Sequence, residues 1–423
     1  MIGRLTRFEL KKTLGGKFFR VALCLMLLLN LLLNCGIREW YEVQDLVRQE
    51  SSMVDNLSNQ QKNNFFALMK SARVVAQVCK QNWKQYAQLT PEDKTALAET
   101  LKERYGENVL DRDSFVPTDE MINTTGTLEG SDENDLGLIL NLQVVEGRNQ
   151  DEEENRQRVL KSAKRLGQDA VKKGDSYNIR RNLRVLKLYA ETRQPSTAPT
   201  IRGWSDFLFG SSTMLLVYLM VLLACAGSFS NERESQALLL LHTAKNGKTK
   251  TLLAKYLSGV VTAAGLVLLF QAVTVGAIAF KTGIFGASEP IYLLDGMDYC
   301  PFRLTIGQYA ILTMLGWMLC AVILSVILNT VSALSKNSVI SYGVGAVVLG
   351  GSAALAYAKP RIEWFSGPLA FTWNNRFFES YYSANLVTFP LWWGLTLVIF
   401  WAIIGILCIV LADRVFHRKR RAL

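Results

Sequence analysis

Six long runs of uncharged, mostly apolar residues constrain this chain more than any other feature of its sequence. None of the runs contains Asp, Glu, Lys, Arg or His. A helix of about 20 apolar residues crosses the hydrocarbon core of a bilayer, which is about 30 Å thick. Buried helices of a large soluble protein would account for one such run but not for six. We therefore predict an all-α polytopic membrane protein with six transmembrane helices. The runs are Val21–Ile37, Phe207–Phe229, Leu257–Phe280, Ile306–Val331, Val339–Tyr357 and Phe389–Leu411.

The first run has a second interpretation, which is a cleaved secretory signal. Basic residues precede it, and "LLNCGI" around Cys35 is similar to a lipoprotein cleavage site. Cleavage there requires a small residue before the cysteine, and Asn34 is a poor fit. Because five further runs follow, we expect Val21–Ile37 to stay in the protein as a membrane helix.

The distribution of charge predicts the orientation in the membrane. Residues 1–20, 230–256, 332–338 and 412–423 together carry 17 Lys and Arg against four acidic residues. Segment 38–203 is nearly neutral, with 25 basic and 26 acidic residues. Basic flanks mark the cytoplasmic side, so we predict a protein of the cell membrane with both termini in the cytoplasm. The net charge of +11 then reflects topology and does not indicate nucleic-acid binding.

The regions between the runs differ in size and composition. Segment 38–203 contains long helical patterns and predicts a large, mainly helical extracytoplasmic insertion between the first and second membrane helices. Within it, 107–150 is rich in Asp, Asn and Gly and predicts a loop, with "LGLILNLQVV" as a candidate short strand. The other predicted regions are a cytoplasmic interfacial amphipathic helix at 1–20, a cytoplasmic loop at 230–256, an external aromatic region at 358–388 and a basic cytoplasmic tail at 412–423.

Cysteine usage leaves one question open. Cys24, Cys225, Cys320 and Cys408 lie within the runs, where a thiol behaves as a small apolar group. Cys79 and Cys300 are the two cysteines in predicted external segments. They would pair only in an oxidising compartment, and the sequence decides neither for nor against this disulfide.

The chain lacks the motifs of catalysis. Gly247-Lys248-Thr249 matches the last three residues of the phosphate-binding motif G-x-x-x-x-G-K-[ST]. The first glycine of that motif is missing, because His242 stands at its position. His242 and His417 are far apart and form no metal-ligand pattern. The runs also lack the acid or histidine relay of a proton-driven carrier. We therefore expect no catalytic residues, no metal and no cofactor in this chain, and no enzyme activity of its own.

Mild polar and small residues remain within the runs. They are typical of helix–helix hydrogen bonds and close helix approach, and a role in lining a substrate pathway is the alternative. These residues are Asn30, Asn34, Gln271, Gly345 and Gly350.

The external region 358–388 is unusually aromatic. One interpretation is an aromatic belt at the membrane–water interface. The other is that 362–388 enters the outer leaflet as a broken helix, with a turn at Gly367-Pro368, and closes an external gate. The gate residues would be Trp364, Phe365, Trp373, Phe377 and Phe378.

The loop 230–256 brings acidic residues, an apolar run, a basic turn and a lysine into the order seen in one transporter family. Here the chain resembles the membrane (permease) subunit of ABC-2 type ABC exporters, although "HTAKNGKT" replaces the usual proline-containing turn. The resemblance covers residues 1–37 and 204–423 and implies that the loop contains a coupling helix that contacts a separate ATPase. The implied contact residues are Glu232, Glu234, Leu238, Leu241, His242, Lys245 and Lys255.

The resemblance also implies partners and a direction of transport. An ABC ATPase subunit would bind ATP and Mg, and a second permease subunit would complete a homodimer or heterodimer in membrane lipid. The substrate would be an amphiphile, such as a peptide, a lipid or a small hydrophobic compound, moved outward. The large insertion keeps a second hypothesis open, a signalling or mechanotransmission protein whose outer domain senses a peptide or controls an envelope enzyme. A channel or scaffold without an ATPase is the third.

Overall fold

The structure is a computed structural model, and it forms two compact units. The helical bundle comprises Met1–Ile37, Asp206–Gly283 and Tyr309–Leu423, and the insertion unit comprises Arg38–Ser205 and Ile284–Gln308. The residues that the structure describes are 2–34, 96, 98–103, 131–191, 194–196, 202–209, 212–237, 247–281, 284, 286–294, 296–358, 367–373 and 375–418.

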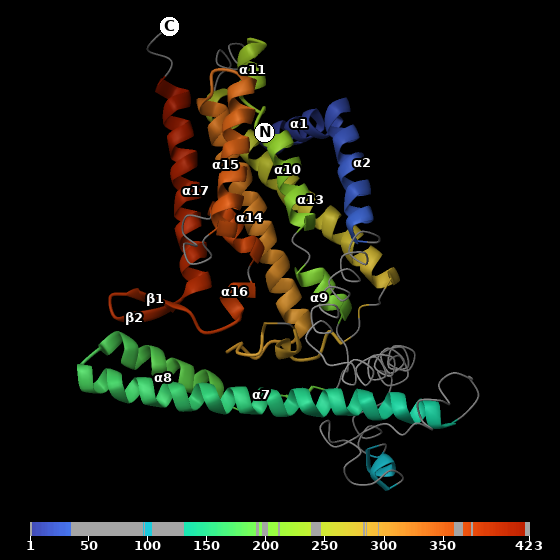
Figure 1. Cartoon of the computed structure of the whole chain (residues 1–423). Helices are drawn as coiled ribbons and strands as arrows, with labels where there is room; N and C mark the ends of the chain where they lie inside the picture. Colours follow the sequence, from blue (N-terminus) through green and yellow to red (C-terminus); the bar gives the residue numbers. More distant parts are fainter. Residues whose placement is uncertain are drawn as a thin grey trace, which may run out of the picture. The chain divides into compact units, whose positions relative to one another are not determined.

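Apolar helices make up most of the described bundle (Figure 1). Within the described residues, five helices are long and apolar enough to cross a membrane, and six if α1 and α2 form one bent span. This confirms a multi-pass, mainly helical architecture. The helices are α1 (Ile2–Gly15), α2 (Lys17–Leu32), α9 (Arg202–Phe209), α10 (Ser212–Cys225), α11 (Ser230–Glu234), α13 (Gly247–Lys281), α14 (Ile306–Leu334), α15 (Ser338–Ala358) and α17 (Trp393–Arg418).

The predicted amphipathic helix at the N-terminus is present but ends earlier than expected. α1 stops at Gly15, and α2 begins at Lys17 after a bend of 66°. Gly16 has an extended backbone, with φ −61° and ψ 129°, which interrupts the helix. The apolar helix therefore starts four residues before the predicted position at Val21.

A break in the second membrane segment separates α10 from the short α11. The unwound backbone is satisfied by side chains of neighbouring helices, as an irregular segment among apolar helices requires. Tyr342 of α15 donates to the Leu223 carbonyl at 3.2 Å, and Ser341 donates to the Ala226 carbonyl. On α14, Ser332 Oγ accepts from the backbone N–H groups of Phe229 and Ser230 at 3.0 and 3.1 Å.

A β-hairpin precedes the last helix and corrects the predicted start of the sixth span at Phe389. Strand β1 (Ser383–Leu386) pairs antiparallel with β2 (Phe389–Trp392), and α17 begins only at Trp393. The two turn residues, Val387 and Thr388, have φ of 48° and 71°. A two-residue hairpin needs positive φ at both positions, which favours Asn-Gly and strains β-branched residues.

Relief of this strain should stabilise the hairpin. We expect Val387→Asn combined with Thr388→Gly to slow amide hydrogen exchange in residues 381–393 by about 30-fold or more, because two strained residues at about 1–3 kcal/mol each store at least about 2 kcal/mol. Exchange is measured by mass spectrometry on the full chain. Val387→Ile keeps the β-branched side chain and should leave exchange unchanged. Equal exchange in the double variant and the parent chain would show that the turn stores no strain.

The insertion unit contains two long helices, α7 (Ser131–Lys173) and α8 (Ser176–Ala190), which lie side by side in Figure 1. The prediction of a loop over 107–150 with a strand in "LGLILNLQVV" is wrong from residue 131 onward, where α7 begins. Short apolar runs do not distinguish strand from helix by period alone. A glycine inside a helix costs only about 1 kcal/mol relative to alanine, so Gly137 and Gly147 did not end the helix.

The loop after α13 belongs to the insertion unit, although it is far from α7 in sequence. It carries the short 3-10 helix η3 (Ile291–Leu293). Tyr292 donates to Asn149 Oδ1 of α7 at 3.0 Å, and Ser196 donates to Glu289 Oε2 at 3.3 Å. These buried contacts join two predicted external segments into one folded body. Cys300 is buried within it and donates weakly to the Phe302 carbonyl, and Cys79 lies outside the described residues.

Candidate functional site

The short helix α11 follows the second membrane segment and is fixed by three consecutive charged residues. Glu232, Arg233 and Glu234 each reach a different part of the bundle. A five-residue helix is too short to be stable by its own backbone bonds. Its position therefore depends on these side chains.

Glu232 belongs to a buried charge cluster centred on Lys255 of α13. Lys255 Nζ lies 2.7 Å from Glu232 Oε1, 3.0 Å from Glu9 Oε2 of α1 and 2.9 Å from the Ser228 carbonyl. The Lys255 side chain is 1% exposed. Lys12 of α1 also pairs with Glu232. A buried lysine that donates three hydrogen bonds to two carboxylates and a carbonyl is fully satisfied, so the cluster joins α1, α11 and α13.

Arg233 and Glu234 bind the facing ends of α14 and α15. Arg233 donates to the carbonyls of Ala333, at 2.8 Å, and Ser335, where α14 ends. Glu234 accepts from the backbone N–H of Ser338, at 2.9 Å, and from its hydroxyl, where α15 begins. A cation at a helix C-terminus and an anion at a helix N-terminus both complement the helix dipole. α14 and α15 are thus each held to α11 by one side chain, Arg233 and Glu234 respectively.

The structure places the predicted ATPase-contact residues in different environments. Glu232 and Lys255 are buried inside the chain, whereas Glu234 is exposed. Leu238, Leu241, His242 and Lys245 lie outside the described residues. For all seven residues, the contact with an ATPase stays a prediction.

Sequence reasoning missed Glu9, Lys12 and Arg233 as members of this site. One signal was available, because Glu9 is the single acidic residue among the six basic residues of segment 1–20. Its partner Lys255 is 246 positions away, and no local pattern indicates that pairing.

The polar residues of the first span form a buried network. Asn30 donates to Thr274 Oγ1 of α13 at 3.0 Å and accepts from Thr213 of α10 at 2.8 Å. Asn34 donates to the Asn30 carbonyl at 2.8 Å and approaches Thr213 at 3.4 Å. Both asparagines are buried and engaged with neighbouring helices. This favours helix packing over a pathway role for them.

The remaining predicted packing positions differ from one another. Gln271 is buried and donates to Met214 Sδ at 3.2 Å, and its Oε1 has no hydrogen-bond partner. At Gly345, an added Cβ would lie 2.6 Å from Leu222 and 2.9 Å from Leu328, so α15 approaches α10 and α14 closely there. At Gly350, no atom of the described residues lies within 4 Å of such a Cβ. In the part of the chain that the structure describes, close helix approach is therefore seen at Gly345 and not at Gly350.

Part of the aromatic segment packs into the bundle. It folds as the 3-10 helix η4 (Gly367–Trp373) and the short α16 (Asn375–Phe378). Thr372 bonds to the Tyr218 hydroxyl at 2.6 Å, and its carbonyl accepts from Trp317 Nε1 at 3.2 Å. Trp317 lies 11 residues after the start of α14, which corresponds to roughly 16 Å along the helix axis.

The predicted gate residues in this segment are only partly described. Phe377 and Phe378 are buried, and Phe378 stacks edge-on with Trp392 at 5.3 Å. Trp364 and Phe365 lie outside the described residues, as does the side chain of Trp373. Half-burial raises the pKa of Glu379 beside this cluster, and the neighbouring Arg376 opposes that rise. Closure of a gate by these residues stays a prediction.

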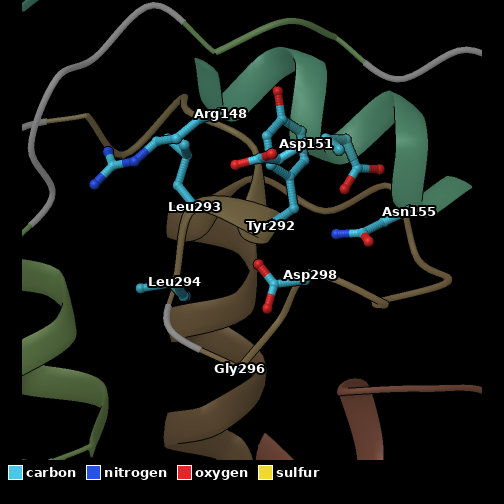
Figure 2. A pocket seen from close by; sticks show the side chains of 9 residues that line it. Arg148, Asp151, Asn155, Tyr292, Leu293, Leu294, Gly296 and Asp298 are labelled. Carbon is cyan, nitrogen blue, oxygen red and sulfur yellow. The ribbon is translucent and has the colours of Figure 1, made fainter. Parts of the chain in front are cut away.

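The insertion unit has a cavity of about 200 Å³ between α7 and the loop that carries η3. Figure 2 shows Asp151 and Asn155 of α7 on one side and Tyr292 and Asp298 of the loop on the other. Its lining is mainly polar. Its full lining is Arg148, Asp151, Glu152, Asn155, Tyr292, Leu293, Leu294, Gly296 and Asp298.

Among the described residues, no group of three or more His, Cys, Asp or Glu is arranged to hold a metal ion. No protein-family model, no curated protein and no solved structure matches the chain.

Proposed function

We propose that this chain is the permease subunit of an ABC-2 type exporter in the cell membrane. In this proposal it has six spans, of which α2 is the first after the interfacial helix α1, and both termini are cytoplasmic. A separate ATPase subunit binds ATP and Mg and drives the chain, which pairs with a second permease subunit. The substrate class is an amphiphile moved outward, since the apolar runs carry no ionisable residue.

The observation that carries this proposal is the attachment of α11. The helix stands directly before residues 238–246, the stretch that would contact the ATPase. Its three charges connect it to α1 and α13, to the end of α14 and to the start of α15. A displacement of α11 would therefore move several spans together. That is the mechanical property an ATPase-driven permease needs at its coupling loop.

The test must separate the ATPase contact from the stability of the buried cluster. Glu232 and Lys255 are unsuitable, because changing them disturbs the fold. We expect Leu238→Glu combined with Leu241→Glu to abolish co-purification of an ATP-hydrolysing subunit from native membranes, because charges replace the apolar run of the coupling loop. ATP turnover per mole of purified chain is the measurement.

A matched control distinguishes a local effect from a general one. Lys336 is exposed in the connection between α14 and α15, and Lys336→Glu should keep both co-purification and ATP turnover. Each variant must elute as a monodisperse particle in size-exclusion chromatography. Undiminished ATP turnover in the double leucine variant would contradict the assignment.

The insertion unit supports a second candidate, an ATPase-coupled signalling or mechanotransmission protein. It is a compact body of its own with a mainly polar cavity, which suits recognition of a ligand or an envelope protein. Transport discriminates the two. Reconstituted vesicles that move fluorescent amphiphilic peptides or lipids favour the exporter, whereas ATP turnover without any transport favours signalling.

A further inference from the structure

The part of the α7–α8 hairpin nearest its turn, residues 158–187, is far more basic than the rest of segment 38–203. Between Arg158 and Lys187 the chain has ten basic and two acidic residues. The remainder of segment 38–203 has 15 basic and 24 acidic residues, so the near-neutral total hides a strong separation of charge. The basic residues are Arg158, Lys161, Lys164, Arg165, Lys172, Lys173, Arg180, Arg181, Arg184 and Lys187.

The hairpin has a well-defined turn and interface. Gly174 supplies the left-handed backbone of the turn, with φ +69°, and Asp175 caps α8 by accepting from the Asn178 N–H at 3.0 Å. Gly167 of α7 faces α8 closely, since Asn182 Cβ lies 3.5 Å from where a Cβ of Gly167 would be. This interface fixes which side of each helix is exposed.

The exposed side of α8 combines positive charge with an apolar residue. Arg180, Leu183, Arg184 and Lys187 follow one another at spacings of three, one and three residues, which places them on one face of the helix. All four are exposed, and Leu183 is 59% exposed.

The α7 side of the hairpin has the same character. Leu166 and Val171 are 46% and 62% exposed, and they lie among exposed lysines and Arg165. A surface that mixes Lys and Arg with exposed aliphatic residues is the composition that binds an anionic lipid surface. An anionic polymer could bind to the basic residues alone. Its binding would not require the exposed aliphatic residues.

We propose that the exposed surface of the α7–α8 hairpin binds the anionic headgroups of the membrane that holds the chain. Segment 35–211 is joined in the sequence at both ends to apolar helices, α2 and α10, so the unit is tethered to the membrane that these helices would cross. The basic residues bind the phosphates, and the aliphatic residues enter the boundary between headgroups and acyl chains. This inference does not depend on the exporter function.

The test places a photo-crosslinking residue, benzoylphenylalanine, at position 190 of the full-length chain. Ala190 is exposed, seven residues after Leu183 on the same face of α8. The chain is reconstituted in nanodiscs of phosphatidylcholine, with or without phosphatidylglycerol, and lipid adducts are quantified by mass spectrometry. We expect adducts with phosphatidylglycerol that decrease with salt. The same probe at Gln150, which is exposed on α7 before the basic stretch 158–187, should give none.

Charge variants decide the mechanism. Each basic residue near an anionic surface contributes roughly a fivefold factor in binding. We therefore expect Arg180→Glu, Arg184→Glu and Lys187→Glu together to lower the adduct yield by about tenfold or more. Arg180→Lys with Arg184→Lys should retain it. Equal yields with neutral lipid, an undiminished yield in the triple variant, or no adduct at all would overturn the proposal.

A last arm separates headgroups from other anions. Inorganic phosphate present during irradiation should not lower the yield of lipid adduct, because a single ion lacks the apolar contact. If soluble polyphosphate present during irradiation abolishes the adduct and remains bound to the discs, the surface recognises an anionic polymer, and the lipid assignment is wrong.

Discussion

Replacing Lys255 with methionine is expected to lower the free energy of unfolding by about 3–5 kcal/mol, because it leaves two carboxylates without their shared cation. The side chain of Lys255 is 1% exposed, and those of Glu9 and Glu232 are 12% and 6% exposed. Neither carboxylate can recover full hydration at these positions. The apparent melting temperature in detergent, followed by tryptophan fluorescence, measures the loss.

Two further variants establish the cause. Lys255→Met combined with Glu9→Gln and Glu232→Gln removes the buried negative charge and should recover most of the lost stability, since an apolar or neutral replacement of a whole buried ion group is often tolerated. Lys11→Met, at an exposed position of α1, should change the melting temperature little. A Lys255→Met chain that melts like the parent would mean that the cluster does not hold α1 and α11 in place.

Replacing Gly345 with leucine is expected to cost about 3 kcal/mol, because the added side chain overpacks the contact of α15 with α10 and α14. Even a Cβ at this position would lie 2.6 Å from Leu222 and 2.9 Å from Leu328. Gly350→Leu is a matched control in the same helix, since nothing lies within 4 Å of its Cβ position. The melting temperature should fall for the first variant and not for the second. Equal melting temperatures would show that α15 does not depend on close approach at Gly345.

The membrane architecture was predictable because its signal is local. Absence of charge over some twenty residues indicated α14, α15 and the part of α13 from Leu257 onward, and apolar residues spaced among basic ones indicated α1. The first ten residues of α13, Gly247–Tyr256, were wrongly predicted as loop because their lysines interrupt the apolar run. The start of α17 was not predictable in this way. Phe389–Trp392 is as free of charged residues as the apolar run that follows, and the hairpin turn at Val387 and Thr388 lacks the Asn-Gly signature of its geometry.

The candidate site was predictable only in part, for a different physical reason. Glu232, Glu234 and Lys255 were indicated by the resemblance of the loop 230–256 to a transporter family, but their partners Glu9 and Ser338, which are remote in the chain, were not. An ion pair between two helices that are remote in the chain produces no periodic sequence pattern in either helix. The insertion unit shows the same limit, because the contact of Tyr292 with Asn149 joins segments that the sequence presents as separate loops.

The attachment of α11 also determines where the bundle is stiff and where it is compliant. Three consecutive residues of α11 are bonded to neighbouring helices. The helix therefore cannot rotate about its own axis without breaking these bonds. Glu9 bonds α1 to Lys255, the lysine that also binds α11. Between α1 and α2 the backbone is extended at Gly16, and the axes of the two helices differ by 66°. The change of direction between α1 and α2 therefore lies at one glycine, and a displacement of α11 would be passed to α13, α14 and α15 through these bonds.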